Sequence, residues 1–228
     1  MASVDYVNNP NQRTPCVLIL DASYSMSMAQ KSGKRPIDAL NDGLKSLEIE
    51  LKKDPSALTR VQLSIISVGG KKNDASILME WTDVVNFEAF NLVPEGNTPL
   101  AEGLILGLKT LEEAKKNLSN AGISYTRPWM MVISDGEPTS DDVLWNKAIA
   151  ECNKAQSERK VEIFSIAVEG ASIEKLTQVS TRPVNTLDGL KFNELFVWLS
   201  KSLSAASKSR PGDNLNLPST DTWRNVGI

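Results

Sequence analysis

The sequence contains no histidine among its 228 residues. Histidine is the general base of Ser-His-Asp and Cys-His catalysis and supplies two ligands of HExxH zinc sites, so these three kinds of site are excluded. Only two cysteines occur, Cys16 and Cys152, and they lie far apart without a CxxC motif. Their spacing argues against a zinc ribbon, a c-type haem and a disulfide scaffold.

Long hydrophobic runs and an excess of one charge are also missing. The longest apolar runs, 16–20 and 129–133, are far shorter than the roughly 20 residues of a membrane-spanning helix. The first residues lack the basic and apolar stretches of a secretory signal. The 25 basic and 28 acidic side chains nearly cancel, which gives no broad basic surface for nucleic acid. We therefore expect a cytoplasmic protein that binds neither membranes nor nucleic acid.

The composition that remains, 41% apolar and 23% charged, is typical of a globular protein. Short apolar runs predict strands near 16–20, 61–68, 77–85, 129–134, 161–168 and 184, the third pairing with the second as a hairpin. Amphipathic patterns predict helices over 36–51, 99–111, 143–155, 173–179 and 192–203. This alternation predicts a doubly wound, Rossmann-like α/β fold, with a mostly parallel sheet of about six strands and helices on both faces.

We expect one domain over 14–206, with an N-terminal extension over 1–13 and a polar C-terminal tail over 207–228. The tail is either docked or disordered. At the helix starts, Thr98 has the character of an N-cap and Pro99 of a first helical residue. Ser140 or Thr139 is expected to cap the helix that begins near 143.

Oxygen-bearing side chains follow three of the predicted structural segments. Asp21, Ser23 and Ser25 form a D-x-S-x-S motif directly after the first strand, Thr98 lies in a G-N-T-P-L turn, and Asp135 follows the strand over 129–134. In doubly wound folds, ligands bind at the carboxyl ends of the strands. Two carboxylates and three hydroxyls, without nitrogen or sulfur, are a donor set for a hard cation such as Mg²⁺, and Mn²⁺ accepts it too.

Each motif alone has a simpler explanation. A D-x-S-x-S segment can cap a turn, Thr98 can be only an N-cap, and Asp135-Gly136 is an ordinary turn signal. Their joint occurrence at predicted strand ends is what favours a divalent-metal site.

The same residues resemble the metal-ion-dependent adhesion site (MIDAS) of von Willebrand factor type A (VWA) domains. The match covers roughly residues 14–206. Four sequence segments are similar to a bacterial TerY/YegL-type branch of this family, which is linked with tellurite resistance and stress operons. They are PIDALNDGL, GNTPLAEGL, ISDGEPTSD and SRPGD. The resemblance implies that Ser23, Ser25 and Thr98 bind the metal directly, and that Asp21 and Asp135 contact it directly or through water. It also implies that a protein partner's Asp or Glu fills the open metal position.

Residues beside these motifs carry two interpretations each. Tyr24 stands where many family members have glycine, and its phenol could contact a partner or narrow the approach. Glu137 could hydrogen-bond the metal's waters or be a solvated turn residue. Lys31, Lys34 and Arg35 could attract an acidic partner or form a solvated loop.

The predicted function is a non-enzymatic, metal-dependent protein-interaction module. The branch resemblance further implies work beside kinase-like and phosphatase-like proteins in a stress or tellurite-resistance system. The alternative is a Mg²⁺-dependent phosphatase or phosphotransferase with Asp21 as nucleophile. Phosphatases of the haloacid dehalogenase type resemble this layout, but they have D-x-D where this chain has Ser23.

Overall fold

The computed structural model describes residues 8–30, 33–71, 73–135, 137–168, 170–209 and 215–225. Within these ranges, six strands form one sheet in the order β3-β2-β1-β4-β5-β6. They are β1 (Thr14–Ala22), β2 (Val61–Gly69), β3 (Asp74–Asp83), β4 (Trp129–Ser134), β5 (Glu162–Ala167) and β6 (Asn185–Thr186). All neighbours pair in parallel except β2 and β3, which form an antiparallel hairpin at one edge. The predicted doubly wound, mostly parallel sheet is thereby confirmed.

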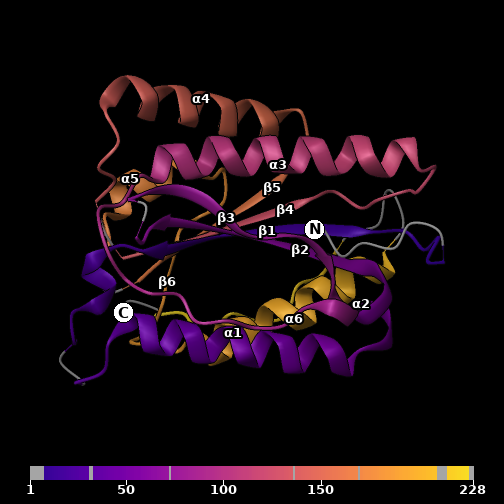
Figure 1. Ribbon diagram of the computed structural model, residues 1–228, viewed down its shortest axis with the longest axis horizontal. Helices are drawn as coiled ribbons and strands as arrows, with labels where there is room; N and C mark the ends of the chain where they lie inside the picture. The colour runs from indigo at the N-terminus through magenta and orange to yellow at the C-terminus, as the bar shows by residue number, and fades with distance from the viewer. Residues whose placement is uncertain are drawn as a thin grey trace.

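Helices cover both faces of this sheet, as predicted (Figure 1). One face carries α1 (Pro36–Lys53), α2 (Pro55–Arg60) and α6 (Phe192–Lys208), and the other carries α3 (Leu100–Asn120), α4 (Asp142–Ser157) and α5 (Ile173–Val179). Two short 3-10 helices, η1 (Tyr24–Ser27) and η2 (Val84–Asn86), follow β1 and β3. Within the described ranges, no helix combines the length and apolar character needed to cross a bilayer.

The central strand β1 is buried along its whole length. Cys16, Leu18 and Leu20 pack into the core under α1 and α6, whereas Val17 and Ile19 pack into the core under α3 and α4. A strand covered on both faces needs apolar side chains in both directions. This is why its sequence is a continuous apolar run and not an alternating one.

The start of α3 differs from the prediction. The helix begins at Leu100 with Pro99 as its N-cap, so Thr98 is not the cap and Pro99 is not the first helical residue. The Ala101 N–H group donates to the Ser140 hydroxyl, 3.1 Å away, which lies in the loop before α4. Because that loop supplies the acceptor for a first-turn N–H group, the helix does not need a side-chain cap from Thr98.

The start of α4 also differs from the prediction. Its N-cap is Asp141, whose carboxylate accepts from the Leu144 N–H group at 2.9 Å, and neither Thr139 nor Ser140 caps it. The Thr139 hydroxyl accepts from the Thr98 N–H group at 3.1 Å. Both expected caps therefore serve the neighbouring loop and helix.

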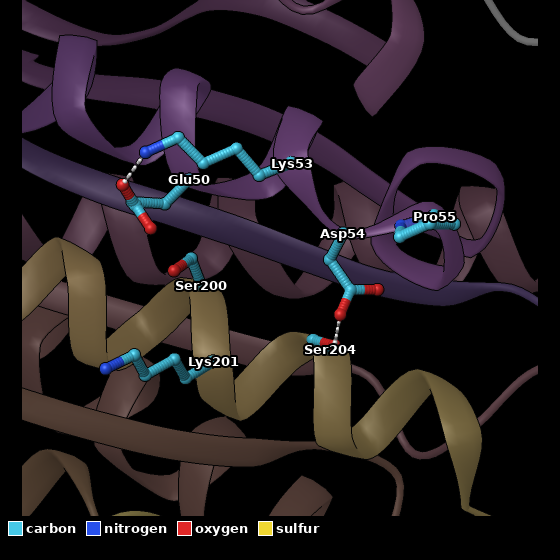
Figure 2. Close-up of a pocket in the computed structure, with 7 residues that line it drawn as sticks. All are labelled: Glu50, Lys53, Asp54, Pro55, Ser200, Lys201 and Ser204. Atoms are coloured by element: carbon cyan, nitrogen blue, oxygen red, sulfur yellow. Dashed lines mark hydrogen bonds and ion pairs between the residues drawn. The ribbon is translucent and has the colours of Figure 1, made fainter.

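The helix α2 lies between the predicted helix over 36–51 and the predicted strand over 61–68, where the sequence patterns predict no helix. Asp54 makes the short helix possible. Its carboxylate accepts from the Ser56 and Ala57 N–H groups at 2.8 and 3.0 Å. It also accepts from the Ser204 hydroxyl at 2.6 Å (Figure 2) and from Lys208 at 2.9 Å, which ties α2 to α6. One carboxylate thus joins α1, α2 and α6.

The described part of the C-terminal tail, 215–225, packs on the domain. Trp223 is fully buried, and its ring centroid lies 5.4 Å from that of Trp198. The Trp198 indole N–H group donates to the Pro218 carbonyl at 2.8 Å. Arg224 forms an antiparallel bridge with Leu187, directly after β6. Residues 210–214, which include most of the SRPGD wording, lie outside the described residues, as do 1–7 of the expected N-terminal extension.

Candidate metal centre

The site lies where the strand order reverses. The chain places β2 on one side of β1 and β4 on the other, so the carboxyl ends of β1 and β4 form a topological switch point. Leu20 pairs with Ile133, which sets Asp21 at the end of β1 beside Ser134 at the end of β4. Such a switch point is the usual ligand position in doubly wound folds.

A chain of hydrogen bonds connects these strand ends. The Ser134 hydroxyl donates to Asp21 Oδ2 at 2.5 Å, and the Ser23 N–H group donates to Asp21 Oδ1 at 2.8 Å. The Ser25 hydroxyl donates to Asp135 Oδ1 at 2.8 Å. Its oxygen lies 2.9 Å from the hydroxyl oxygen of Ser23, within hydrogen-bond distance. Four of the five expected ligands are thereby brought together.

Thr98 is tied to this group through its backbone. The Thr98 carbonyl accepts from the Thr139 N–H group at 2.9 Å, in the loop after Asp135. Two residues earlier, the Gly96 carbonyl accepts from the Tyr24 N–H group at 2.9 Å. The loop that carries Thr98 is therefore bonded to the loops after β1 and after β4, and Thr98 itself is 4% exposed.

Gly69 fixes a close approach of backbones beneath the site. It ends β2 with a φ of +83°, and a Cβ atom there would lie 2.6 Å from the Asn97 carbonyl oxygen and 3.0 Å from the Ser23 nitrogen. A side chain would therefore displace the backbone beside two expected ligands, Ser23 and Thr98. In the sequence, Gly69 directly follows the predicted strand over 61–68.

The two carboxyl groups sit in an unfavourable electrostatic setting. Asp21 is fully buried, and this burial raises its pKa, although hydrogen bonds from Ser134 and Ser23 oppose the rise. Asp135 is 9% exposed, and burial together with the charge of Asp21 raises its pKa to about 6. A cation between the loops would relieve both the desolvation and the repulsion.

The donor set fits a hard divalent cation held partly by neutral oxygens. Across the described ranges, no three or more His, Cys, Asp or Glu side chains converge into a metal-binding group. A cation at this position would therefore depend on hydroxyls from Ser23, Ser25 and Thr98 beside the carboxylates of Asp21 and Asp135. All five are oxygen donors, which suits Mg²⁺ or Mn²⁺ and not zinc or copper.

The residues expected at the rim lie on the surface. Tyr24 is 65% exposed on η1, and Glu137 is exposed in the loop before α4. Arg35 pairs with Asp38 through two bonds of 2.7 Å, which offsets its charge and favours the solvated-loop interpretation. Lys31 and Gly136 lie outside the described residues.

Sequence reasoning missed three hydroxyls that build the site. Ser134 holds the Asp21 carboxylate, while Thr139 and Ser140 position the Thr98 loop and the start of α3. For Ser134 a signal existed, since it directly precedes Asp135 at a strand end. For the other two, no local pattern separates a hydroxyl that caps its own helix from one that caps a neighbouring helix.

Comparisons with known proteins show which solved structures have a similar fold. No protein-family model matches the sequence, and no curated protein matches it either. The pilus adhesin SpaC from Lactobacillus rhamnosus GG is similar in structure, with a TM-score of 0.67 and 14% identity over 85% of this chain and 31% of the adhesin. Proximal thread matrix protein 1 from the mussel byssus gives a TM-score of 0.55 and 15% identity over 85% of this chain and 48% of its own. The chain thus spans less than half of either neighbour, and the likeness bears on the doubly wound α/β fold alone.

Proposed function

We propose that this chain is a metal-dependent protein-interaction domain of the VWA type. A Mg²⁺ ion held by Asp21, Ser23, Ser25, Thr98 and Asp135 would accept a carboxylate from a protein partner. The observation that carries the proposal is the hydrogen-bond chain that joins Asp21, Ser23, Ser25 and Asp135 at the switch point.

The donor chemistry supports this function. Neutral hydroxyls bind a cation without cancelling its charge, so the bound metal keeps an attraction for an incoming carboxylate. The exposed Tyr24 at the rim is placed to contact the same partner. The two neighbours in structure are by name an adhesin and a matrix protein, which is in keeping with a binding role.

The setting in the cell is part of the proposal. Cys16 and Cys152 are both free and buried, which suits a reducing compartment, and we infer the cytoplasm. The wording shared with the TerY/YegL-type branch favours a bacterial stress or tellurite-resistance system, with kinase-like or phosphatase-like proteins as candidate partners. Loss of the gene without any change in stress or tellurite tolerance would count against this setting.

Titration calorimetry of the chelator-treated protein with Mg²⁺ and Mn²⁺ tests the metal site. We expect one saturable site in the wild type. Asp135→Asn and Ser25→Ala should weaken binding by at least about tenfold, because each removes or neutralises an oxygen ligand. Asp42→Asn removes the same charge from an exposed position on α1 and should bind as the wild type does.

The outcomes separate three interpretations. If the folded wild type binds neither ion, alone or with an acidic partner present, the metal-dependent mechanism fails. Hydrolysis of p-nitrophenyl phosphate that is lost in Asp21→Asn would instead favour the phosphatase alternative. Metal binding without turnover supports the interaction domain, and capture of a partner that chelator abolishes then identifies what the metal binds.

A further inference from the structure

A cavity of about 490 Å³ opens beside the candidate metal centre. It lies between the end of β5, the start of α5, the strand β6 and the docked tail. Of these elements, α5 and β6 are labelled on the left of Figure 1. Its apolar lining comes from Val168, Ala171, Ile173 and Leu187. A volume of this size is in the range of ordinary binding sites for small groups.

The cavity shares a wall with the loop that carries Asp135. The Val168 N–H group donates to the Ser134 carbonyl at 2.9 Å, directly before Asp135. A Cβ atom on Gly170, which lines the cavity, would lie 3.8 Å from the Asp135 carbonyl oxygen. A ligand at the metal and a group in the cavity would therefore be near neighbours.

The opposite wall is built by the tail. Asn225 lines the cavity, and its N–H group donates to the Thr186 carbonyl at 2.8 Å. The Asp188 N–H group donates to the Trp223 carbonyl at 2.8 Å, and Trp223 is fully buried. The wall is thus held by backbone bonds and a buried anchor, so the cavity is already formed.

The described lining carries polar groups of Thr186, Asp188 and Asn225 as well as apolar groups, and Ile173 is its one large apolar side chain that is exposed. Ile173 is 44% exposed at the cavity, so this domain leaves a large aliphatic side chain uncovered there. Among the lining residues that the structure describes, Asp188 alone carries a carboxylate, and its pairing with Lys191 at 2.5 Å offsets this charge. Covering Ile173 with another apolar side chain would stabilise a complex by removing this surface from water.

The spacing of the strands fixes how far the two sites lie apart. The candidate metal centre lies at the ends of β1 and β4, and the cavity lies at the ends of β5 and β6. These four strands are consecutive in the sheet, in the order β1-β4-β5-β6. Neighbouring strands are about 4.8 Å apart, so the two points are separated by about 10 Å. An extended peptide rises about 3.3 Å per residue and spans this separation in about three residues.

We propose that the cavity receives a large apolar side chain of the same partner segment whose carboxylate binds the metal, two or three residues away along the partner chain. The inference rests on the proposed function and adds the partner's chemistry: an extended segment that carries Asp or Glu and, at this spacing, Leu, Ile, Met or Phe.

A phage-displayed library of random octapeptides tests the spacing. The library is selected on the full chain in Mg²⁺ and eluted with EDTA. We expect the eluted clones to carry Asp or Glu with a large apolar residue two or three positions away. Synthetic peptides from these clones are then titrated onto the wild type and onto variants.

The variants separate the cavity from the metal. Ile173→Ser removes an apolar wall and Ala171→Leu fills the cavity, and each should weaken peptide binding by about tenfold or more. Neither should change the affinity for Mg²⁺ alone. Ile49→Ser, an exposed position on α1, makes the same change as Ile173→Ser elsewhere and should leave peptide binding as in the wild type.

The alternative results are distinguishable. Eluted acidic peptides without a positional apolar preference, or unchanged binding in both cavity variants, would overturn this inference and leave the proposed function standing. Apolar peptides that bind equally in EDTA would overturn the link between cavity and metal. A wild type that binds Mg²⁺ but selects no acidic peptide would overturn the partner carboxylate, and the inference with it.

Discussion

Replacing Gly69 by alanine tests whether the close backbone approach at Gly69 holds the loops that carry Ser23 and Thr98 in place. Gly69 has a φ of +83°, and the added Cβ atom would meet the Asn97 carbonyl at 2.6 Å. Gly122 provides a matched control. It follows α3 with a φ of +70°, and nothing lies within 4 Å of the position a Cβ atom would take.

The two substitutions share one cost and differ in another. Alanine in the left-handed region costs about 1–2 kcal/mol, and this applies to both glycines. Crowding of a packed position costs about 1–3 kcal/mol more, and only Gly69 is crowded. Gly122→Ala should therefore lower the free energy of unfolding by about 1–2 kcal/mol, and Gly69→Ala by about 2–5 kcal/mol.

Urea unfolding measures these losses, and calorimetry with Mg²⁺ measures the site. In Gly69→Ala the Ser23 and Asn97 backbones must move apart, so Mg²⁺ affinity should fall, because this ion demands near-octahedral geometry. Gly122→Ala should keep the wild-type affinity. Equal losses of stability in the two variants, together with equal Mg²⁺ affinities, would refute the argument that Gly69 positions the site.

Three further predictions concern stability. Burial alone would raise the pKa of Asp54, but hydrogen bonds that include one from Lys208 lower this pKa below its ordinary value of 3.8. Asp54→Asn should therefore lower the free energy of unfolding by about 1–2 kcal/mol at pH 7. Urea unfolding should show this difference vanishing as the pH falls below about 4 toward the lowered pKa. Arg13 and Asp83 form a buried ion pair, 3.5 Å apart, so Arg13→Met should lower the free energy of unfolding by about 3–5 kcal/mol. Adding Asp83→Asn should restore part of this stability, and a double-mutant cycle without coupling would contradict the prediction. Trp223→Ala should lower the free energy of unfolding by about 3–5 kcal/mol, and a loss below about 1 kcal/mol in denaturant titration would show that the tail does not stabilise the domain.

The fold was predictable because burial on both faces leaves a strong trace in sequence. The continuous apolar run over 16–20 located β1, but the strand extends to Thr14 and Ala22 because its pairing with Val61 and Gly69 continues beyond the apolar residues. In contrast, β6 has two residues and exists only through its pairing with β5, so the sequence near 184 could indicate no more than an extended piece.

The site was predictable to the extent that strand ends determine it. Asp21 lies near the end of β1 and Asp135 directly follows the adjacent parallel strand β4, so the topology alone brings them together. The N-caps were wrong for a physical reason: hydroxyls bond to whichever unsatisfied N–H group lies nearest in space. For Thr139 and Ser140 that group belongs to the Thr98 segment, about 40 residues earlier in the chain.

The balance of charge at the site bears on how metal and partner depend on each other. Asp21 and Asp135 can at most neutralise a divalent ion, and the remaining donors, Ser23, Ser25 and Thr98, are neutral. A third acidic residue would hold the ion more tightly alone and would weaken its attraction for an outside carboxylate. With hydroxyls in its place, the proposed site would bind the ion less tightly and would attract a partner carboxylate more strongly. In the proposed function the two binding steps would then be coupled: a carboxylate that raises the affinity for Mg²⁺ by some factor would have its own affinity raised by Mg²⁺ by the same factor.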